Sequence, residues 1–81
     1  MTKLEQKLVD LGYYQVAKIR YEKFYKSTHI VIGVNSKTKK IYGKIKDNFN
    51  YIDKDYQINE LVSAFNEMQK DLEELKKYVC N

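Results

Sequence analysis

The sequence predicts an α+β fold in which a short helix, a three-stranded antiparallel meander and a long helix follow one another in the order α-β-β-β-α. Two observations support it: apolar and polar residues alternate with a period of two in the middle of the chain, and apolar residues recur with 3-4 spacing near its end. Sequential strands with short connections pair as neighbours, so both helices are expected on the apolar face of the meander. With 81 residues, 43% of them hydrophobic and 32% charged, the chain (residues 1–81) is expected to fold as a single domain.

Residues 1–12 are predicted to form the short helix. Thr2 and Glu5 have the spacing of a capping box, in which each side chain accepts a hydrogen bond from the backbone amide of the other residue. Gly12 then supplies the left-handed backbone conformation that commonly ends a helix. An apolar stripe at i, i+4 and i+7 is made by Leu4, Leu8 and Leu11.

The basic meander is assigned to residues 14–46, and its first strand admits two interpretations. In the stretch AKIRYE, residues 17–22, apolar and charged residues alternate, and the β-branched and aromatic content favours a strand. The alternative is a helix, whose apolar stripe would consist of Tyr14, Ala17, Tyr21 and Phe24. In that case Lys18 and Arg20 would not share a sheet face with the later strands.

The second and third strands are indicated more directly. In THIVIGV, residues 28–34, one face collects three β-branched residues, Ile30, Ile32 and Val34. The polar stretch NSKTK is predicted to be a hairpin loop. In KIYGKIK, residues 40–46, the inward face consists of Ile41, Gly43 and Ile45. The outward face of that strand consists of Lys40, Tyr42, Lys44 and Lys46.

The long helix is predicted over residues 55–79, after a polar loop at residues 47–54. Asp53 or Asp55 is expected to cap its first turn. At 1.5 Å per residue the helix is on the order of 35 Å long, which exceeds the length that a small sheet covers. Its apolar residues have the 3-4 spacing of an amphipathic helix: Ile58, Leu61, Phe65, Met68, Leu72, Leu75 and Val79.

This excess length leads to a hypothesis about assembly. The 3-4 spacing holds over three heptads, and Asp71 and Lys76 stand where they could pair across a parallel two-helix seam. The alternative is that the whole stripe packs against the sheet and first helix of its own chain. The residues expected to project beyond the sheet, and to form an interface with a second copy or a partner, are Leu72, Leu75, Tyr78 and Val79.

The net charge of +4 is distributed unevenly along the chain. Residues 18–46 contain nine Lys and Arg residues and a single acid, Glu22. Residues 55–81 contain three basic and six acidic residues. A basic region of this kind attracts polyanions or acidic protein surfaces.

The compartment is predicted from what the chain lacks. Cys80 is the only cysteine and cannot form an internal disulfide, which indicates a reducing environment. No apolar run approaches the roughly 20 residues that span a membrane. We therefore expect a cytoplasmic protein with no membrane partner.

No group of residues is arranged for catalysis, so we expect no enzymatic activity, no cofactor and no metal. His29 is the only histidine, and no cysteine or second histidine stands near it in sequence to complete a metal site. Cys80 lies next to the C-terminus and would need a histidine within reach to act as a nucleophile. Gly12, Gly33 and Gly43 stand alone, so there is no glycine-rich phosphate loop.

The candidate binding site is a set of basic side chains around one aromatic ring. Its members, on the outward face of the predicted sheet and at its hairpin, are Lys18, Arg20, Lys37, Lys39, Lys40, Tyr42, Lys44 and Lys46. Lysines interleaved with an aromatic residue suit a phosphate backbone, with Tyr42 stacking on a base or sugar. The alternative is that the lysines are only the solvated face of a small sheet and a defence of its edge against aggregation. The scarcity of acids in this region favours the functional interpretation.

The two ends of the chain resemble a known group of proteins. The opening LEQKLVDLGY and the segment DYQINELVSAFNEMQKDLEELKK are similar to small uncharacterised proteins encoded by phages and prophages of Gram-positive bacteria. These share a short N-terminal helix ending in LGY, a few strands and a C-terminal helix. The similarity covers about 35 of the 81 residues and consists of core and cap positions. By analogy it implies a phage protein that binds and disables host machinery, including nucleic-acid-guided defence complexes such as CRISPR.

The sequence supports three hypotheses about function. The first is a non-enzymatic, phage-encoded protein that docks on a host protein or nucleoprotein complex through its basic sheet face. It would inhibit or modulate that complex in the cytoplasm of the bacterial host. The second is direct binding of DNA or RNA by the lysines and tyrosine of the sheet. The third is a structural or assembly role, in which the protein is a homodimer rather than a monomer and pairs through its long helix.

Overall fold

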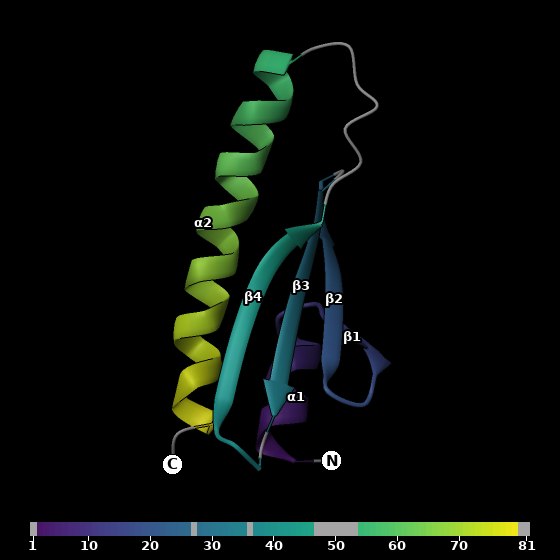
Figure 1. Cartoon of the computed structure of the whole chain (residues 1–81), viewed down its shortest axis with the longest axis vertical. Helices are drawn as coiled ribbons and strands as arrows, with labels where there is room; N and C mark the ends of the chain where they lie inside the picture. Colours follow the sequence, from purple (N-terminus) through teal and green to yellow (C-terminus); the bar gives the residue numbers. More distant parts are fainter. Residues whose placement is uncertain (1, 27, 36, 47–53, 80–81) are drawn as a thin grey trace.

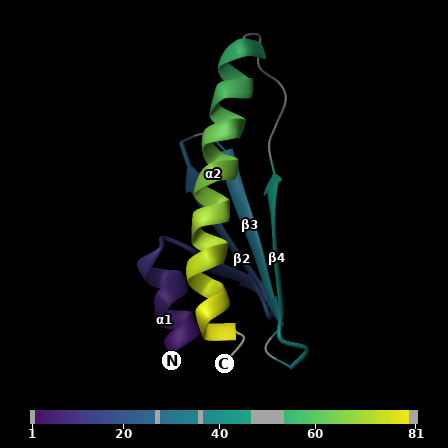
Figure 2. The same ribbon diagram turned by 90° about the vertical axis from the view of Figure 1, so that its left-hand side faces the viewer.

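The computed structural model describes residues 2–26, 28–35, 37–46 and 54–79, with side chains of the last segment from residue 59 onward. The elements are α1 (Lys3–Asp10), β1 (Tyr14–Ala17), β2 (Arg20–Tyr25), β3 (Thr28–Asn35), β4 (Lys40–Lys46) and α2 (Lys54–Val79). The strands form one antiparallel sheet in the order β1-β2-β3-β4, with both helices on the same face (Figure 1, Figure 2). The predicted α+β fold with a helix at each end is confirmed. Neither described helix combines the length and the apolarity that crossing a bilayer requires.

The start of α1 follows its sequence signals. The Thr2 hydroxyl oxygen accepts a hydrogen bond from the Glu5 amide at 3.1 Å, and the Thr2 amide donates to Glu5 Oε1 at 3.0 Å. The predicted capping box is therefore present. Gly12, just beyond the helix, has a φ of 97°, which turns the chain toward the sheet. Leu8 is fully buried and anchors α1 in the core.

The sheet has four strands instead of the predicted three, because the predicted first strand is in fact a hairpin. Lys18 and Ile19 form the turn between β1 and β2, and Ala17 pairs with Arg20 across it. The helical alternative for residues 14–25 is also wrong. Most two-residue hairpin turns contain Gly, Asn or Asp. Since this one contains none of them, the alternation that runs through it resembles a single continuous strand.

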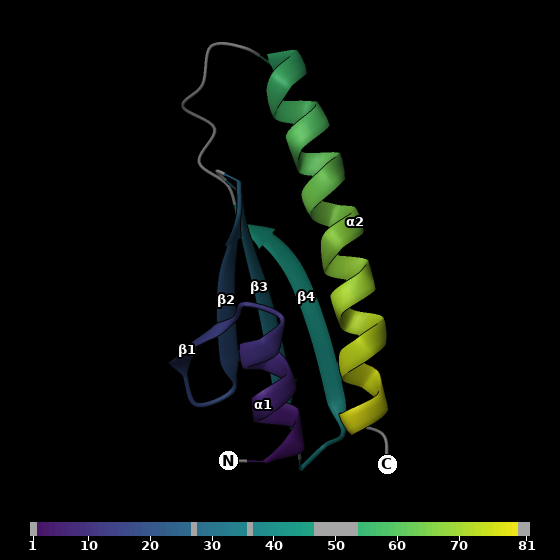
Figure 3. The same cartoon turned by 180° about the vertical axis from the view of Figure 1, so that it is seen from behind.

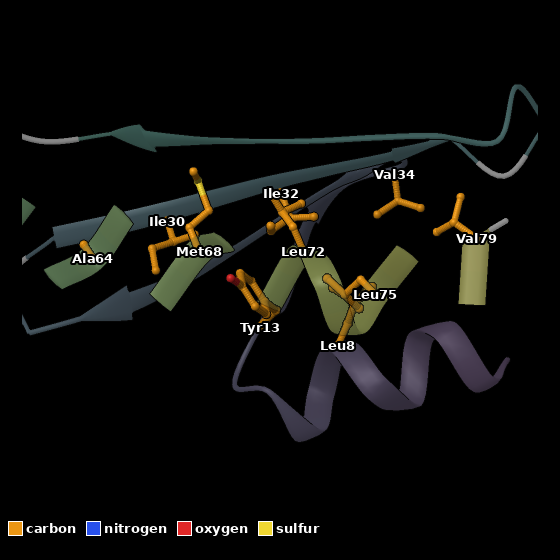
Figure 4. Packing of buried hydrophobic residues seen from close by; sticks show 10 residues of the cluster. All are labelled: Leu8, Tyr13, Ile30, Ile32, Val34, Ala64, Met68, Leu72, Leu75 and Val79. Carbon is orange, nitrogen blue, oxygen red and sulfur yellow. The ribbon is translucent and has the colours of Figure 1, made fainter. Parts of the chain in front are cut away.

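The core lies between the sheet and the two helices (Figure 4). A Cβ on Gly43 of β4 would lie 2.9 Å from Met68 Sδ and 3.1 Å from Leu72 Cδ1. The missing side chain at this position is what allows α2 to approach β4 so closely. The buried members of the core are Leu8, Tyr13, Ile30, Ile32, Val34, Ala64, Met68, Leu72, Leu75 and Val79.

The helix α2 extends beyond the sheet at its N-terminal end and not, as predicted, at its C-terminal end (Figure 1). Leu72, Leu75 and Val79 are only 8%, 0% and 3% exposed, and of the four residues predicted to project only Tyr78 is exposed. The reason is that α1 packs beside the C-terminal half of α2 and closes the core there (Figure 3). The patch predicted from these residues is therefore not available to a partner.

The apolar stripe of α2 also differs from the predicted one. Ala64 is fully buried, whereas Phe65 is exposed together with Val62. A straight helix has 3.6 residues per turn, so its buried side drifts relative to a 3-4 repeat. The predicted loop residues 47–53, the predicted cap at Asp53 and the side chain of Ile58 lie outside the described residues. Lys54 and Asp55 already belong to α2, so the loop ends earlier than predicted and the alternative cap at Asp55 is wrong.

Candidate functional site

One face of the sheet carries no helix, and the strand register decides which side chains share it (Figure 1). Strand pairing aligns three rows: Arg20, Gly33 and Tyr42; Glu22, Val31 and Lys44; and Phe24, His29 and Lys46. Lys40, at the start of β4, lies on the same side because it is two residues from Tyr42. These ten residues are termed the outer face.

Aromatic rings lie exposed on the outer face. The Tyr42 ring covers Gly33, since a Cβ on Gly33 would overlap Tyr42 Cε1. The centroids of the Phe24 and His29 rings are 3.8 Å apart, with 37° between the ring planes. Phe24 is 61% exposed and Tyr42 is 50% exposed. Exposed aromatic surface is one of the features that mark interaction sites, so the outer face is a candidate interaction site.

The charge of the outer face is positive and mostly unpaired. Its one acid, Glu22, is nearly buried and lies 4.0 Å from the Arg20 Nε. Lys40, Lys44 and Lys46 make no ion pair with any residue that the structure describes. As far as the described residues show, β4 therefore presents three ammonium groups without an ion pair on the same side as the aromatic rings.

The structure divides the predicted basic set into two groups. The members that share the outer face are Arg20, Lys40, Tyr42, Lys44 and Lys46. Lys18 lies in the β1–β2 turn and Lys37 in the turn before β4, where both line a cavity at one end of the sheet. Lys39 is in the same turn as Lys37 and has a φ of 58°. The sequence thus predicted one surface where the fold makes two.

Sequence reasoning missed the aromatic pair of the outer face. Phe24 and His29 stand on either side of the β2–β3 connection and pair directly across the two strands. Ending the first strand at Glu22 leaves Phe24 outside the sheet. The alternation from Arg20 through Glu22 to Phe24 is the signal that would have included it.

Lys23 lies on the helix-covered face, and its ammonium group is paired inside the protein. Lys23 Nζ lies 2.7 Å from Asp71 Oδ2 and 3.2 Å from Glu67 Oε2, and it donates to the Leu11 carbonyl oxygen at 3.0 Å. The Tyr13 hydroxyl donates to Asp71 Oδ2 at 2.7 Å. Burial, followed by this hydrogen bond, raises the pKa of Tyr13, so the hydroxyl stays protonated. These five residues are termed the buried charge network.

The buried charge network changes the interpretation of two residues. Asp71 is almost completely buried, so it is not available to pair with a second helix. Of the two interpretations of the long helix, the one in which it packs against its own chain applies at this residue. Lys23 belongs to the basic region of the sequence, yet its charge is met inside the protein and adds nothing to the outer face. The network joins β2 and the segment after α1 to the middle of α2, and we assign it a role in stability.

Among the described residues, no three His, Cys, Asp or Glu side chains converge in the way that a metal site requires. Cys80 lies outside the described residues. Compared with known proteins, the chain matches no family model, no curated protein and no solved structure. The outer face is therefore interpreted from its own chemistry.

Proposed function

We propose that this protein is a non-catalytic binding protein whose outer face holds single-stranded nucleic acid. The observation that carries this proposal is that exposed aromatic rings and lysines without an ion pair among the described residues share the sheet face that carries no helix. Aromatic side chains stack on bases of any identity, and a positive surface follows the phosphate backbone. Some RNA-binding domains stack two or three bases on the aromatic residues of a four-stranded sheet. The outer face resembles the binding surface of such domains in its chemistry, and no similarity of strand topology is implied.

The spacing of the lysines suits an extended strand. Lys44 and Lys46 occupy alternate positions of β4, and such positions are roughly 6.8 Å apart. This is about twice the 3.4 Å rise of a stacked nucleic acid strand. A strand whose bases are splayed apart can therefore place successive phosphates near successive lysines. The proposed stacking positions are the pair Phe24 and His29 for one base and Tyr42 for another.

The arrangement of layers favours a single strand over a duplex. Direct reading of B-DNA requires an element that enters a groove about 12 Å wide. Both helices lie on the opposite side of the sheet from the outer face (Figure 2). In addition, paired and stacked bases present no free ring surface to Phe24 or Tyr42. We therefore expect a duplex to bind only through its phosphates and more weakly.

Defence of a sheet edge is the alternative role of these lysines. β4 is an edge strand, and lysines there hinder pairing with other chains. The other edge strand, β1, carries no charge, but it is only four residues long and its register with β2 is irregular, and both features also protect an edge. Edge defence and ligand binding make different predictions for the β4 lysines, because only binding requires that their replacement weaken the affinity for an oligonucleotide.

The proposal is tested by fluorescence anisotropy with labelled oligonucleotides of about 12 nucleotides, within the range of one binding site. We expect micromolar binding of oligo-dT and oligo-U at low salt and weaker binding of a duplex of equal length. The logarithm of the affinity should fall with the logarithm of salt concentration by about 0.7 per phosphate contact. Undetectable binding at low salt, or preference for the duplex, would reject the proposal.

Variants assign the binding to the outer face. Replacing Lys40, Lys44 and Lys46 by Gln should reduce the salt slope by about 2, since each contact contributes about 0.7. Phe24→Ala should weaken binding by about fivefold to hundredfold, because stacking contributes about 1–3 kcal/mol per base. The control is Lys70→Gln, an exposed position of α2 on the other layer. A loss of affinity in this control equal to that in the triple variant would indicate non-specific charge attraction.

A second candidate function is docking on an acidic surface of a host protein or nucleoprotein complex, which is thereby inhibited or modulated. The resemblance of both ends to phage proteins supports it. So does one structural observation: exposed aromatic surface continues on β1 at Tyr14, which pairs with Glu22 of the outer face. Tyrosine and arginine, which the outer face contributes as Tyr42 and Arg20, are enriched among the residues that dominate the energetics of protein interfaces.

This second candidate has its own test. Tagged protein is incubated with nuclease-treated lysate of a Gram-positive host, and the retained proteins are compared between the wild type and Phe24→Ala. Retention of one protein by the wild type and not by the variant would support docking. If nothing is retained, or the same proteins appear with both baits, the docking proposal fails. Leu72, Leu75 and Val79 are buried, and this burial contradicts a dimer interface at the end of the long helix.

A further inference from the structure

Two lysines of the predicted basic set line a cavity that the outer face does not include. This cavity has a volume of about 500 Å³ and is termed the basal cavity. It lies where the start of α1, the β1–β2 turn and the turn before β4 come together at one end of the sheet (Figure 3). Its apolar lining is formed by Leu4, Ile19, Tyr21 and Val34. Its cationic lining is formed by Lys18 and Lys37.

The β1–β2 side of the basal cavity is held by two hydrogen bonds. The Ile19 carbonyl oxygen accepts from the Val34 amide at 2.8 Å, which ties the turn to β3. Gln15 Nε2 donates to the Lys18 carbonyl oxygen at 3.2 Å, which braces the turn from within. Ile19 is therefore fixed at the cavity although it is 43% exposed.

The other walls of the basal cavity are held as well. Asn35 Oδ1 accepts from the amides of Lys37 and Thr38 at 3.0 and 3.3 Å, which orders the turn before β4. The capping box of Thr2 and Glu5 fixes the first turn of α1. A largely preformed cavity of this volume, with an apolar lining and a few polar groups, has the properties of a small-molecule site.

The charges of the basal cavity define the ligand. Lys18 and Lys37 make no ion pair within the described part of the chain. Glu5 is the only acid of the lining. The hydrogen bond from the Thr2 backbone amide is the main cause that holds the pKa of the Glu5 carboxyl below its usual value, and the Thr2 side chain adds to it. This carboxylate is therefore ionised and already engaged at the helix start. The cavity therefore combines two available positive charges with exposed apolar surface.

We propose that the basal cavity binds a small amphipathic anion, an alkyl or aryl monocarboxylate. The carboxylate lies between Lys18 and Lys37, and the apolar body covers Ile19 and the neighbouring apolar lining. Burial of this exposed apolar surface supplies the driving force, and the two ammonium groups select the charge of the head group. The site shares no residue with the outer face, so it does not depend on the function proposed there.

The probes for this site are octanoate, octanol and octyltrimethylammonium, which share an alkyl chain and differ in their head groups. Each is titrated into the ¹⁵N-labelled full chain, and amide shifts are followed by NMR. We expect octanoate to saturate with a dissociation constant of about 0.1–10 mM, as suits a ligand of about ten non-hydrogen atoms. The shifted amides should be those of Lys18, Ile19, Val34 and Lys37. Octanol should bind at least about twofold more weakly, and the cation more weakly still.

Two substitutions should change the affinity for octanoate in opposite directions. Lys37→Gln should lower it by about twofold to fivefold, as expected for an exposed charge pair. Glu5→Gln should raise it by a similar factor, about twofold to fivefold, because the negative charge is removed while Gln still completes a capping box. Lys70→Gln, on the exposed side of α2, should change nothing.

Several results would overturn the proposal. Equal affinities for octanoate and octanol, or no gain with Glu5→Gln, would show that the cavity does not select an anion. Shifts confined to the outer face would place the ligand elsewhere. An absence of shifts at about 100 mM octanoate, about ten times the weakest expected dissociation constant, would show that the basal cavity is not a binding site.

Discussion

The two faces of the sheet use the same residue type for opposite purposes. On the helix-covered face, the Lys23 ammonium group is buried between the carboxylates of Asp71 and Glu67. On the outer face, Lys44 and Lys46 are exposed and unpaired within the described residues. All three lysines stand in strands of similar local pattern. The difference shows that the position of the helices decides whether a lysine of this sheet is paired inside the protein or exposed to solvent.

The reason for the difference is the cost of burying charge. An ammonium group loses its hydration under a helix, so it persists there only with carboxylates and hydrogen-bond acceptors around it. Lys23 has both, and it also lies over the Tyr13 ring at 4.8 Å from the centroid. On the outer face, water meets the same requirement, and the charge stays available to a ligand.

The largest effect is expected from Lys23→Met. This change leaves Asp71 buried without its cation, and breaking a buried pair in this way costs about 3–5 kcal/mol of the free energy of unfolding. Urea denaturation followed by circular dichroism measures it. The double variant Lys23→Met with Asp71→Asn should recover most of the loss, because the Asn oxygen still accepts from Tyr13. A cost below about 1 kcal/mol for the single variant, as for a surface pair, would remove the contrast between the faces.

The two strand glycines provide the next comparison. Gly43→Ala places a Cβ against Met68 and Leu72 in the packed core, and we expect a loss of about 1–3 kcal/mol. Gly33→Ala meets only the far end of the Tyr42 side chain, which can rotate into solvent, so its cost should stay within about 0.5 kcal/mol. Thermal and urea unfolding of both variants measure the difference. Equal losses would mean that the outer face is as tightly packed as the inner one.

The third prediction concerns pH and the buried charge network. Burial raises the folded-state pKa of Tyr13 above its ordinary value of 10.0. The unfolded chain therefore loses this proton near pH 10 while the folded chain keeps it. The contribution of Tyr13 to stability is complete below that pH and falls above it, with a slope that approaches about 1.4 kcal/mol per pH unit.

Tyr13→Phe isolates this contribution. At pH 7 it should cost about 1 kcal/mol for the lost hydrogen bond to Asp71. Above pH 10 the gap between the variant and the wild type should narrow, because only the wild type carries the titrating group. Urea denaturation at pH 7, 9, 10 and 11 measures both quantities. A gap that stays constant across this series would show that Tyr13 titrates alike in the folded and unfolded chains.

The smallest effect on stability is expected from the outer face. Lys44→Gln combined with Lys46→Gln should change the free energy of unfolding by no more than about 0.5 kcal/mol, as is usual for surface positions. The same variant should lower the affinity for oligo-dT by about tenfold at low salt, since two phosphate contacts are lost. Denaturation and anisotropy are measured on one preparation. A stability loss comparable to that of Lys23→Met would assign these lysines to the fold and not to a ligand.

Several elements could be predicted because their signals are local. Thr2, Glu5 and Gly12 mark the two ends of α1 within a dozen residues. The alternation in THIVIGV and KIYGKIK indicates which side of β3 and β4 is buried, and the 3-4 spacing indicates α2. The β1–β2 turn was not predictable in this way. Lys18 and Ile19 carry no turn signal, and the backbone bond from Val34 to Ile19 comes from a strand far along the chain.

The candidate site shows the same division. Once the strands are placed, the alternation of side chains predicts which residues of the site share one face, namely Arg20, Lys40, Tyr42, Lys44 and Lys46. Alternation does not predict that Lys18 and Lys37 are separate from that face, because their position depends on where two turns meet the start of α1. The burial of Lys23 and the pairing of Phe24 with His29 depend in the same way on neighbouring strands.

Patterns among near neighbours in the sequence were enough to predict the helices at both ends, the strands β3 and β4 and the basic character of the middle of the chain. Three features follow only from the tertiary structure: which lysines are exposed, which end of α2 extends beyond the sheet, and which aromatic rings lie on the outer face. These features depend on which surfaces meet across long sequence separations. Both helices pack on one face of the sheet, and the outer face carries neither of them.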